Sequence, residues 1–219
     1  MMALLVGGLA AAVLSIEEEV IELRDLALGN LEASGVGNPV TAVLLNYRSY
    51  DTFLEVAVLL LALIGIWAVA KKARIPIKSP NTPVLITFER LFMPLMIVSG
   101  GYLLWLGADR TGGAFQAGAV LGALGVLWVA ASLWTPNDRL RRLTRPALVV
   151  GMAAFLLVGG GMMLLGGDFF EYPREDAKTW ILLIETAATI SIGITLVMLF
   201  IGGIPPNADQ NKGESGDHD

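Results

Sequence analysis

Cysteine is absent from the 219-residue sequence, and histidine occurs once, as His218 in the terminal segment. Without cysteine the chain can form no disulfide, no thiolate metal site and no cysteine-ligated iron–sulfur cluster. A single histidine leaves no histidine cluster for metal or haem. The sequence also contains no nucleotide-binding loop and no nucleophile–base arrangement. We therefore expect no metal site, no cofactor and no catalytic site of the soluble-enzyme kind.

Charged residues are also scarce. They make up 16% of the chain, whereas soluble domains carry about 25%, and 55% of the residues are hydrophobic. So few charges cannot cover a surface that faces water, and the sequence therefore predicts an all-α integral membrane protein. The net charge of −5 argues against nucleic acid as a partner.

Six apolar segments can be compared with the roughly 20 residues that a spanning helix requires. The first, residues 3–16, is short. It lacks the positive residues that precede the apolar core of a signal peptide, which favours a short or tilted span over a cleaved signal. The sequence therefore predicts about six transmembrane helices, of which the other five cover residues 52–70, 84–106, 114–134, 146–165 and 179–204.

Two further segments are not expected to span the membrane. Residues 17–26 are charged and apolar at helical spacing, which indicates an amphipathic helix at the membrane interface or against a neighbour. Residues 35–51 have too short an apolar part, which predicts a re-entrant or surface element. Asp51 or Thr52 is expected to cap the helix that follows, and Pro94 to bend the third span.

A proline-rich linker at residues 76–83 divides the chain into two modules. Residues 1–75 form a predicted two-span module, and residues 84–205 form a predicted four-span module. Residues 206–219 are polar and acidic, and we expect them to be disordered.

Basic residues are concentrated in the loops that follow the second and the fourth predicted span. In a six-span arrangement both loops lie on one side of the membrane, and an excess of Lys and Arg marks the cytoplasmic side. This predicts a multi-pass protein of the cell inner (plasma) membrane with cytoplasmic N- and C-termini. The basic residues concerned are Lys71, Lys72, Arg74, Lys78, Arg139, Arg141, Arg142 and Arg145.

Charged side chains at membrane depth are costly, so they are candidates for function. Glu55 lies one turn into the second span and Asp51 precedes it by four residues, so both carboxylates share one helix face. One interpretation is a proton or cation relay near the outer face. The other is a pair of carboxylates at a helix start, where the helix dipole favours them.

Glu185 lies inside the sixth span, about 9 Å along the helix axis from its start. With Thr186, Thr189 and Gly193 it forms a narrow polar or small stripe. Such a stripe faces protein or water rather than lipid. Glu185 is therefore either an ion-handling group or a carboxylate that is hydrogen-bonded to a neighbouring helix or subunit.

Two other patterns have structural interpretations. Glu89 and Arg90, at the start of the third span, are expected to anchor that helix by snorkelling to the interface, with a functional pair as the alternative. Small residues on one face of the fourth span predict close backbone packing against another helix. They are Ala114, Gly118, Gly122 and Gly125.

The stretch from residue 89 to residue 125 resembles a known family. Arg90-Leu91-Phe92-Met93-Pro94 is followed by Tyr-Leu-Leu-Trp-Leu-Gly at 102–107 and by Thr-Gly-Gly-Ala-Phe-Gln-Ala-Gly at 111–118. Over about residues 84–204 the chain resembles the MrpB/MnhB family, which are membrane subunits of the Mrp-type (Mnh-type) sodium/proton antiporters. Thr111 and Ala114 stand where the family pattern has proline and glycine. The resemblance implies a structural role for Arg90, Pro94, Gly112, Gly113, Phe115, Gln116 and Gly118.

A second resemblance lies at the start of the second span. Arg48, Asp51, Thr52 and Glu55 match the Asp-x-Arg-x-x-Asp-Thr-x-x-Glu segment at the end of MrpA, the large subunit of these antiporters, whereas Asn46 replaces the first acid. The same element is a small separate subunit (MbhE-like) in related membrane-bound hydrogenases. The chain thus resembles a fusion of this element with an MrpB-type domain, which favours Glu55 for ion translocation or for a coupling interface.

The two resemblances imply an accessory membrane subunit of an Mrp-type cation/proton antiporter, which is a secondary transporter and not an enzyme. The implied partners are the large antiporter-like subunits MrpA and MrpD, the small subunits MrpC, MrpE, MrpF and MrpG, membrane lipid, Na+ and H+. The candidates for ion translocation are Glu55, Asp51, Glu185 and Thr189. Two alternatives stay open: a membrane subunit of a complex-I-like energy-converting hydrogenase or oxidoreductase, and a purely structural spacer.

Overall fold

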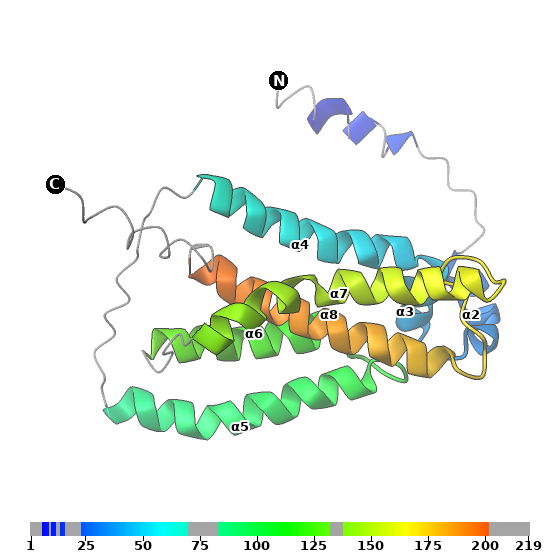
Figure 1. Cartoon of the computed structure of the whole chain (residues 1–219). Coiled ribbons are helices and arrows are strands. Elements are labelled where there is room, and N and C mark those ends of the chain that lie inside the picture. Colours follow the sequence, from blue (N-terminus) through cyan, green and yellow to red (C-terminus); the bar gives the residue numbers. More distant parts are fainter. Residues whose placement is uncertain are drawn as a thin grey trace.

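Helices form the whole regular structure of the described chain (Figure 1). The computed structural model describes residues 6–8, 10–11, 14–15, 23–69, 83–131 and 138–201, and no strand occurs among them. The long helices are α4 (Ser49–Val69), α5 (Pro83–Leu106), α6 (Ala114–Ala130), α7 (Asp138–Leu164) and α8 (Ala177–Phe200). Shorter elements precede them: α2 (Leu23–Gly29), the 3-10 turn η1 (Leu31–Ser34), α3 (Pro39–Ala42) and the π-helical turn η2 (Val43–Tyr47).

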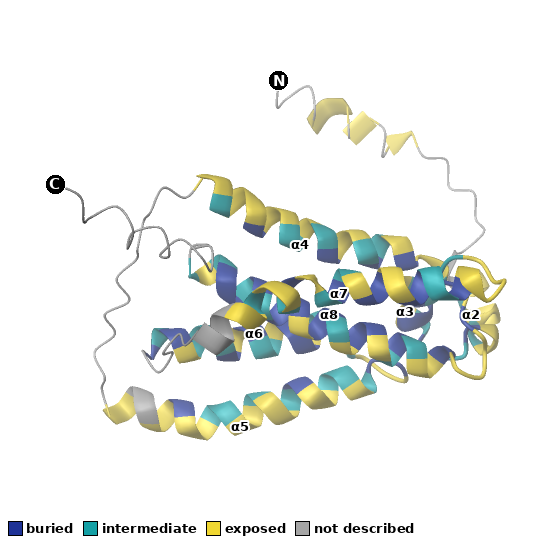
Figure 2. Ribbon diagram, in the orientation of Figure 1, coloured by how far each residue is buried: buried dark blue, intermediate teal, exposed yellow. Residues whose placement is uncertain are grey.

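Helix α8 is the centre of the bundle. It packs extensively against α6 and α7, and to a smaller extent against α4 and α5. Two thirds (67%) of its apolar segment is buried, against 17% for α4. Figure 2 shows buried residues along α8 and mostly exposed residues on α4 and α5. The small and hydroxyl side chains of α8 let its neighbours approach closely. Ser191 is one example, because its hydroxyl donates to the Leu148 carbonyl of α7 at 2.5 Å.

The glycine stripe of α6 lies directly against α8. A Cβ atom added to Gly118 would lie 2.8 Å from Cγ2 of Ile192, and one added to Gly122 would lie 3.1 Å from Cβ of Leu196. A side chain at Gly118 would overlap Ile192, and one at Gly122 would require Leu196 to shift by a few tenths of an ångström. The prediction that this stripe packs closely against another helix is confirmed.

Helices α4 and α5 lie at the edges of the bundle and expose large apolar side chains. On α4 these include Leu54 and Val58, and on α5 they include Leu91 and Trp105. Among the described residues, α4, residues 142–164 of α7, and α8 are long and apolar enough to cross a membrane, and α6 is a shorter apolar helix. Half of the predicted first span, residues 3–16, lies outside the described residues.

Several expected helix boundaries were wrong. Helix α7 begins at Asp138, so Pro146 lies inside it and does not start it. In membrane helices an internal proline is tolerated because neighbouring groups satisfy the freed carbonyl. Helix α4 begins at Ser49, so neither Asp51 nor Thr52 is its cap. Most of the predicted helix 17–26, the linker up to residue 82 and the acidic tail lie outside the described residues.

The connecting segment before α4 does not span the membrane, as expected. Asn38 caps α3 by accepting the Val40 N–H at 3.0 Å, and Pro39 occupies the first helical position. In the π turn that follows, the Leu44 carbonyl accepts the hydroxyl of Thr52 at 2.6 Å. This segment therefore leads into α4 as an ordered turn.

Candidate functional site

The turn between α5 and α6 brings two glycines against the centre of the bundle. Gly113 has a φ of +123°, a backbone conformation that residues other than glycine rarely adopt. Its N–H donates to the Leu103 carbonyl at 3.0 Å, which closes the turn. Gly107 is equally confined, because an added Cβ would lie 2.8 Å from the Cα atom of Gly113. Because neither glycine has a side chain, a side chain from another helix can lie directly against this turn.

That third group is the carboxylate of Glu185, which is only 4% exposed. Cβ atoms added to Gly113 and Gly107 would lie 2.9 Å from its Oε1 and 3.1 Å from its Oε2, respectively. The backbone N–H of Ala114, the first residue of α6, donates to the carboxylate. Oε2 has no hydrogen-bond partner within the described part of the chain, so the Ala114 bond belongs to Oε1. One oxygen is thus held at a positive helix terminus and the other is unpaired.

Glu185 lines a cavity of about 370 Å³ between α4, the α5–α6 turn, α7 and α8. Glu55 of α4 lines the same cavity. The two carboxylates that the sequence singled out separately therefore share one space. The polar side chains and turn glycines around it are Thr41, Thr52, Gly112, Gly113 and Gln116.

The segment that contains α3 is tied to the turn by hydrogen bonds that the sequence did not indicate. The amide of Asn38 donates to the Gly107 carbonyl at 3.0 Å and to the Arg110 carbonyl at 2.6 Å. Thr41 donates to the same Gly107 carbonyl at 2.5 Å. Only the Asn-Pro pair that starts α3 could have drawn attention to this segment. These bonds fix the wall of the cavity opposite α8.

Replacing Asn38 with alanine is expected to destabilise the protein by about 1–3 kcal/mol, because a buried group that makes three hydrogen bonds is lost. Thermal unfolding in detergent, followed by circular dichroism, measures the change. Asn30→Ala is the matched control, since the amide of Asn30 makes an exposed bond to Leu26. Equal unfolding temperatures for the two variants would show that the bonds from Asn38 to the α5–α6 turn do not stabilise the protein.

Two exposed ion pairs lie at the same end of the bundle. Lys178 pairs with Asp109 at 2.6 Å, and Arg174 pairs with Glu32 at 2.9 Å. Exposed pairs of this kind contribute at most about 1 kcal/mol each. They join the start of α8 and the residues just before it to the α5–α6 turn and to η1, without forming part of the cavity lining.

The other predicted site residues lie elsewhere. Asp51 forms an ion pair with Arg48 and does not line the cavity with Glu55. Thr189 is buried, but its hydroxyl donates to the Glu185 carbonyl inside α8 at 2.7 Å. Thr186 is exposed, so only part of the expected stripe is buried. Of the predicted candidates, the structure brings Glu55 and Glu185 together.

The interpretation of Glu89 as a snorkelling anchor was wrong. Its side chain is 1% exposed, and neither carboxylate oxygen has a hydrogen-bond partner within the described residues. A snorkelling carboxylate would reach water. Arg90 is exposed, as the anchor interpretation requires. Neighbouring positions on a helix point in different directions, which allows one to be buried and the next exposed.

The sequence of the last four helices matches a known family. A family model described as a domain related to the MnhB subunit of Na+/H+ antiporter matches residues 84–204, more than half of the 219-residue chain. The chain belongs to this MnhB-related family. The matched region contains nearly all of α5 and the whole of α6, α7 and α8, and so includes both the glycine turn and Glu185.

A curated relative of the MnhB-related chain is an uncharacterized protein of Methanocaldococcus jannaschii. It is 29% identical over 170 residues, which cover 66% of this chain and 63% of the relative. The chain thus spans less than two thirds of the relative's length.

Two solved structures share the fold. A chain of the Mrp complex from Dietzia sp. DQ12-45-1b has a TM-score of 0.67 and 22% identity, and the match covers 94% of this chain and 25% of that one. A chain of the membrane-bound sulfane sulfur reductase, an archaeal respiratory membrane complex, has a TM-score of 0.69 and 25% identity, with 94% of both chains covered. With its apolar helices, the MnhB-related chain is therefore an all-α, multi-pass membrane protein.

The motif residues of the MnhB-related domain have different places in the structure. Gly112, Gly113, Phe115 and Gln116 line the cavity, whereas Gly118 packs against α8. Arg90 and Pro94 lie on the exposed side of α5. The glycine turn thus borders the cavity that holds Glu55 and Glu185.

Proposed function

We propose that this MnhB-related chain is an accessory membrane subunit of an Mrp-type multisubunit cation/proton antiporter. The observation that carries the proposal is the match of residues 84–204 to a domain related to an antiporter subunit. The fold shared with a chain of an Mrp complex supports it. The partners would be the large subunits MrpA and MrpD, the small subunits MrpC, MrpE, MrpF and MrpG, and surrounding lipid.

The cavity supports a contribution to the ion path. Oxygen atoms bind hard cations such as Na+, and a carboxylate at membrane depth can also carry a proton. Oε1 of Glu185 is held by the Ala114 N–H, so Oε2 can exchange a proton or a cation without moving the helix. Glu55 on the opposite wall is exposed and offers a second exchange site. The main proton relays would lie in MrpA and MrpD.

The module division and the orientation are part of the same proposal. Residues 1–75 would correspond to the end of MrpA and residues 84–205 to MrpB, joined by the linker at 76–83. Cytoplasmic basic loops in the plasma membrane would put both termini in the cytoplasm and the cavity in the outer half of the membrane. A single Dietzia chain matches 94% of this chain, so one polypeptide there covers both proposed modules, which occupy a quarter (25%) of its length. This supports a natural connection between the modules.

A second candidate function is a membrane subunit of a respiratory redox complex. The observation that favours it is the match to the sulfane sulfur reductase chain, which covers 94% of both chains. Purification of the chain with its natural partners in mild detergent separates the two. Large antiporter-like subunits without redox subunits would support the antiporter, whereas co-purified iron–sulfur subunits would overturn it.

Replacing Glu55 with glutamine is expected to slow cation/proton exchange several-fold while the complex still assembles. The variant removes a charge from the cavity wall and keeps the shape of the side chain. Exchange is measured as Na+-dependent dissipation of a pH gradient in membrane vesicles. Asp51→Asn is a matched control on the same helix, because Asp51 does not line the cavity. Wild-type exchange in a fully assembled Glu55→Gln complex would exclude Glu55 from the ion path.

A further inference from the structure

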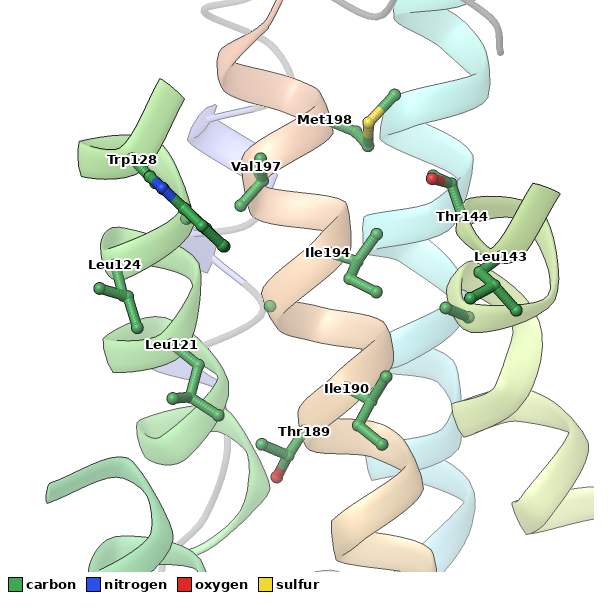
Figure 3. Close-up of a pocket in the computed structure, with 13 residues that line it drawn as sticks. Leu121, Leu124, Trp128, Leu143, Thr144, Thr189, Ile190, Ile194, Val197 and Met198 are labelled. Carbon is green, nitrogen blue, oxygen red and sulfur yellow. The ribbon is translucent and has the colours of Figure 1, made fainter. Parts of the chain in front are cut away.

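An apolar groove lies on the other side of α8 from the α5–α6 turn. Helix α8 forms its floor, and α6 and α7, which pack mainly on α8 and not on each other, form its walls. Figure 3 shows Leu124 and Trp128 on α6, Leu143 on α7 and Ile194 on α8 directed toward this space. Its volume is about 340 Å³, and none of the residues that line it is charged. This groove is therefore suited to a hydrocarbon and not to an ion.

One end of the groove lies beside a cluster of basic residues. Leu143 and Thr144 line the groove in the first turns of α7, and the exposed residues Arg142 and Arg145 flank them in sequence. Residues 139 and 141, one turn earlier on the same helix, are also arginines. Trp128 lines the same end, and tryptophan is enriched at the boundary between lipid and water. An apolar trough thus ends at a positive surface.

The length of the groove suits an extended hydrocarbon chain. It follows α8 from Thr189 to Met198, a length of about 14 Å at 1.5 Å per residue. A single extended acyl chain can follow the groove over this length, with its other side open to surrounding lipid.

We propose that this groove binds one acyl chain of an anionic phospholipid, whose phosphate lies against the arginines at the start of α7. Basic pockets between transmembrane helices on the cytoplasmic side bind anionic headgroups in this way. The apolar lining supplies affinity for the chain, and the arginines supply selectivity for the negative headgroup. The lipid would fill the gap between α6 and α7 and so stabilise their positions on α8.

The test uses the full chain, purified in mild detergent and incubated with equal amounts of phosphatidylglycerol and phosphatidylcholine. Lipid retained after gel filtration is quantified by mass spectrometry. The wild type is expected to retain phosphatidylglycerol in several-fold excess. Arg142→Gln/Arg145→Gln is expected to remove that preference, and Ala147→Phe, which fills the groove, is expected to remove bound lipid of both kinds. Circular dichroism checks that each variant is folded.

Two controls match these variants. Val149→Phe adds the same bulk on α7 outside the groove, and Arg110→Gln removes an exposed arginine at the other end of the bundle. Both are expected to retain lipid as the wild type does. Equal retention of the two lipids by the wild type would overturn the proposal. So would crosslinking of Ile190→Cys, the only cysteine in that variant, to a partner polypeptide in the native complex.

Discussion

Replacing Glu185 with glutamine is expected to slow cation/proton exchange at least about tenfold, equivalent to about 1.4 kcal/mol in the barrier. Glutamine keeps a carbonyl oxygen that can accept the Ala114 N–H, so the start of α6 stays capped. It removes the negative charge and the exchangeable proton from the position of Oε2, which is unpaired within the described chain. The expected result is an assembled complex with little exchange.

The comparison with Glu185→Ala separates transport from structure. Alanine removes the cap as well as the charge, so this variant is expected to lose stability in addition to exchange. Glu32→Gln is the control for charge, because Glu32 is exposed and lies outside the cavity. Exchange in vesicles and subunit composition after purification are measured for all three. If Glu185→Gln exchanges ions normally and only Glu185→Ala fails, Glu185 is a helix cap and nothing more.

Replacing Gly118 with leucine is expected to destabilise the protein by about 3 kcal/mol or more, and to prevent its incorporation into a complex. An added Cβ would lie 2.8 Å from the Ile192 side chain and 3.3 Å from the Thr189 carbonyl. Overpacking of this kind forces backbone shifts. Because α8 also carries Glu185, separating α6 from α8 would open the cavity. Detergent unfolding and the yield of purified complex measure the effect.

Gly101→Leu is the matched control for this variant. Gly101 lies on the exposed side of α5, and an added Cβ would have no neighbour within 4 Å. Leucine there is expected to leave stability unchanged or to raise it slightly, because leucine favours helix more than glycine does. Equal losses for the two variants would mean that glycine serves helix flexibility in this protein and not close packing.

The helices themselves could be predicted from the sequence because the membrane imposes length and composition on them. The centres of α4 to α8 lie where the apolar segments indicated. Their ends were harder, since a proline such as Pro146 interrupts soluble helices but is accommodated here. The central position of α8 agrees with its small and hydroxyl side chains. The sequence alone did not indicate that the glycine stripe of α6 packs against this helix.

The candidate site was predicted in parts and not as a whole. Glu55 and Glu185 were found because charge at membrane depth is costly. Their meeting in one cavity depends on the fold of the segment before α4, where Asn38 and Thr41 reach the α5–α6 turn. No periodicity in the sequence reports such a long-range contact. Glu89 shows the converse error, because its position near a helix start gave no indication of its burial.

The bonds from Asn38 and Thr41 to the Gly107 carbonyl have a consequence for assembly. If the segment with Asn38 and Thr41 were a separate polypeptide from the MnhB-related domain, these bonds would belong to a binding interface whose occupancy depends on protein concentration. A covalent connection makes that association intramolecular, at an effective concentration that no dilution lowers. It also fixes the ratio of this segment to the MnhB-related domain at one to one. A complex built with this chain therefore cannot contain the glycine turn without the segment that holds it in place.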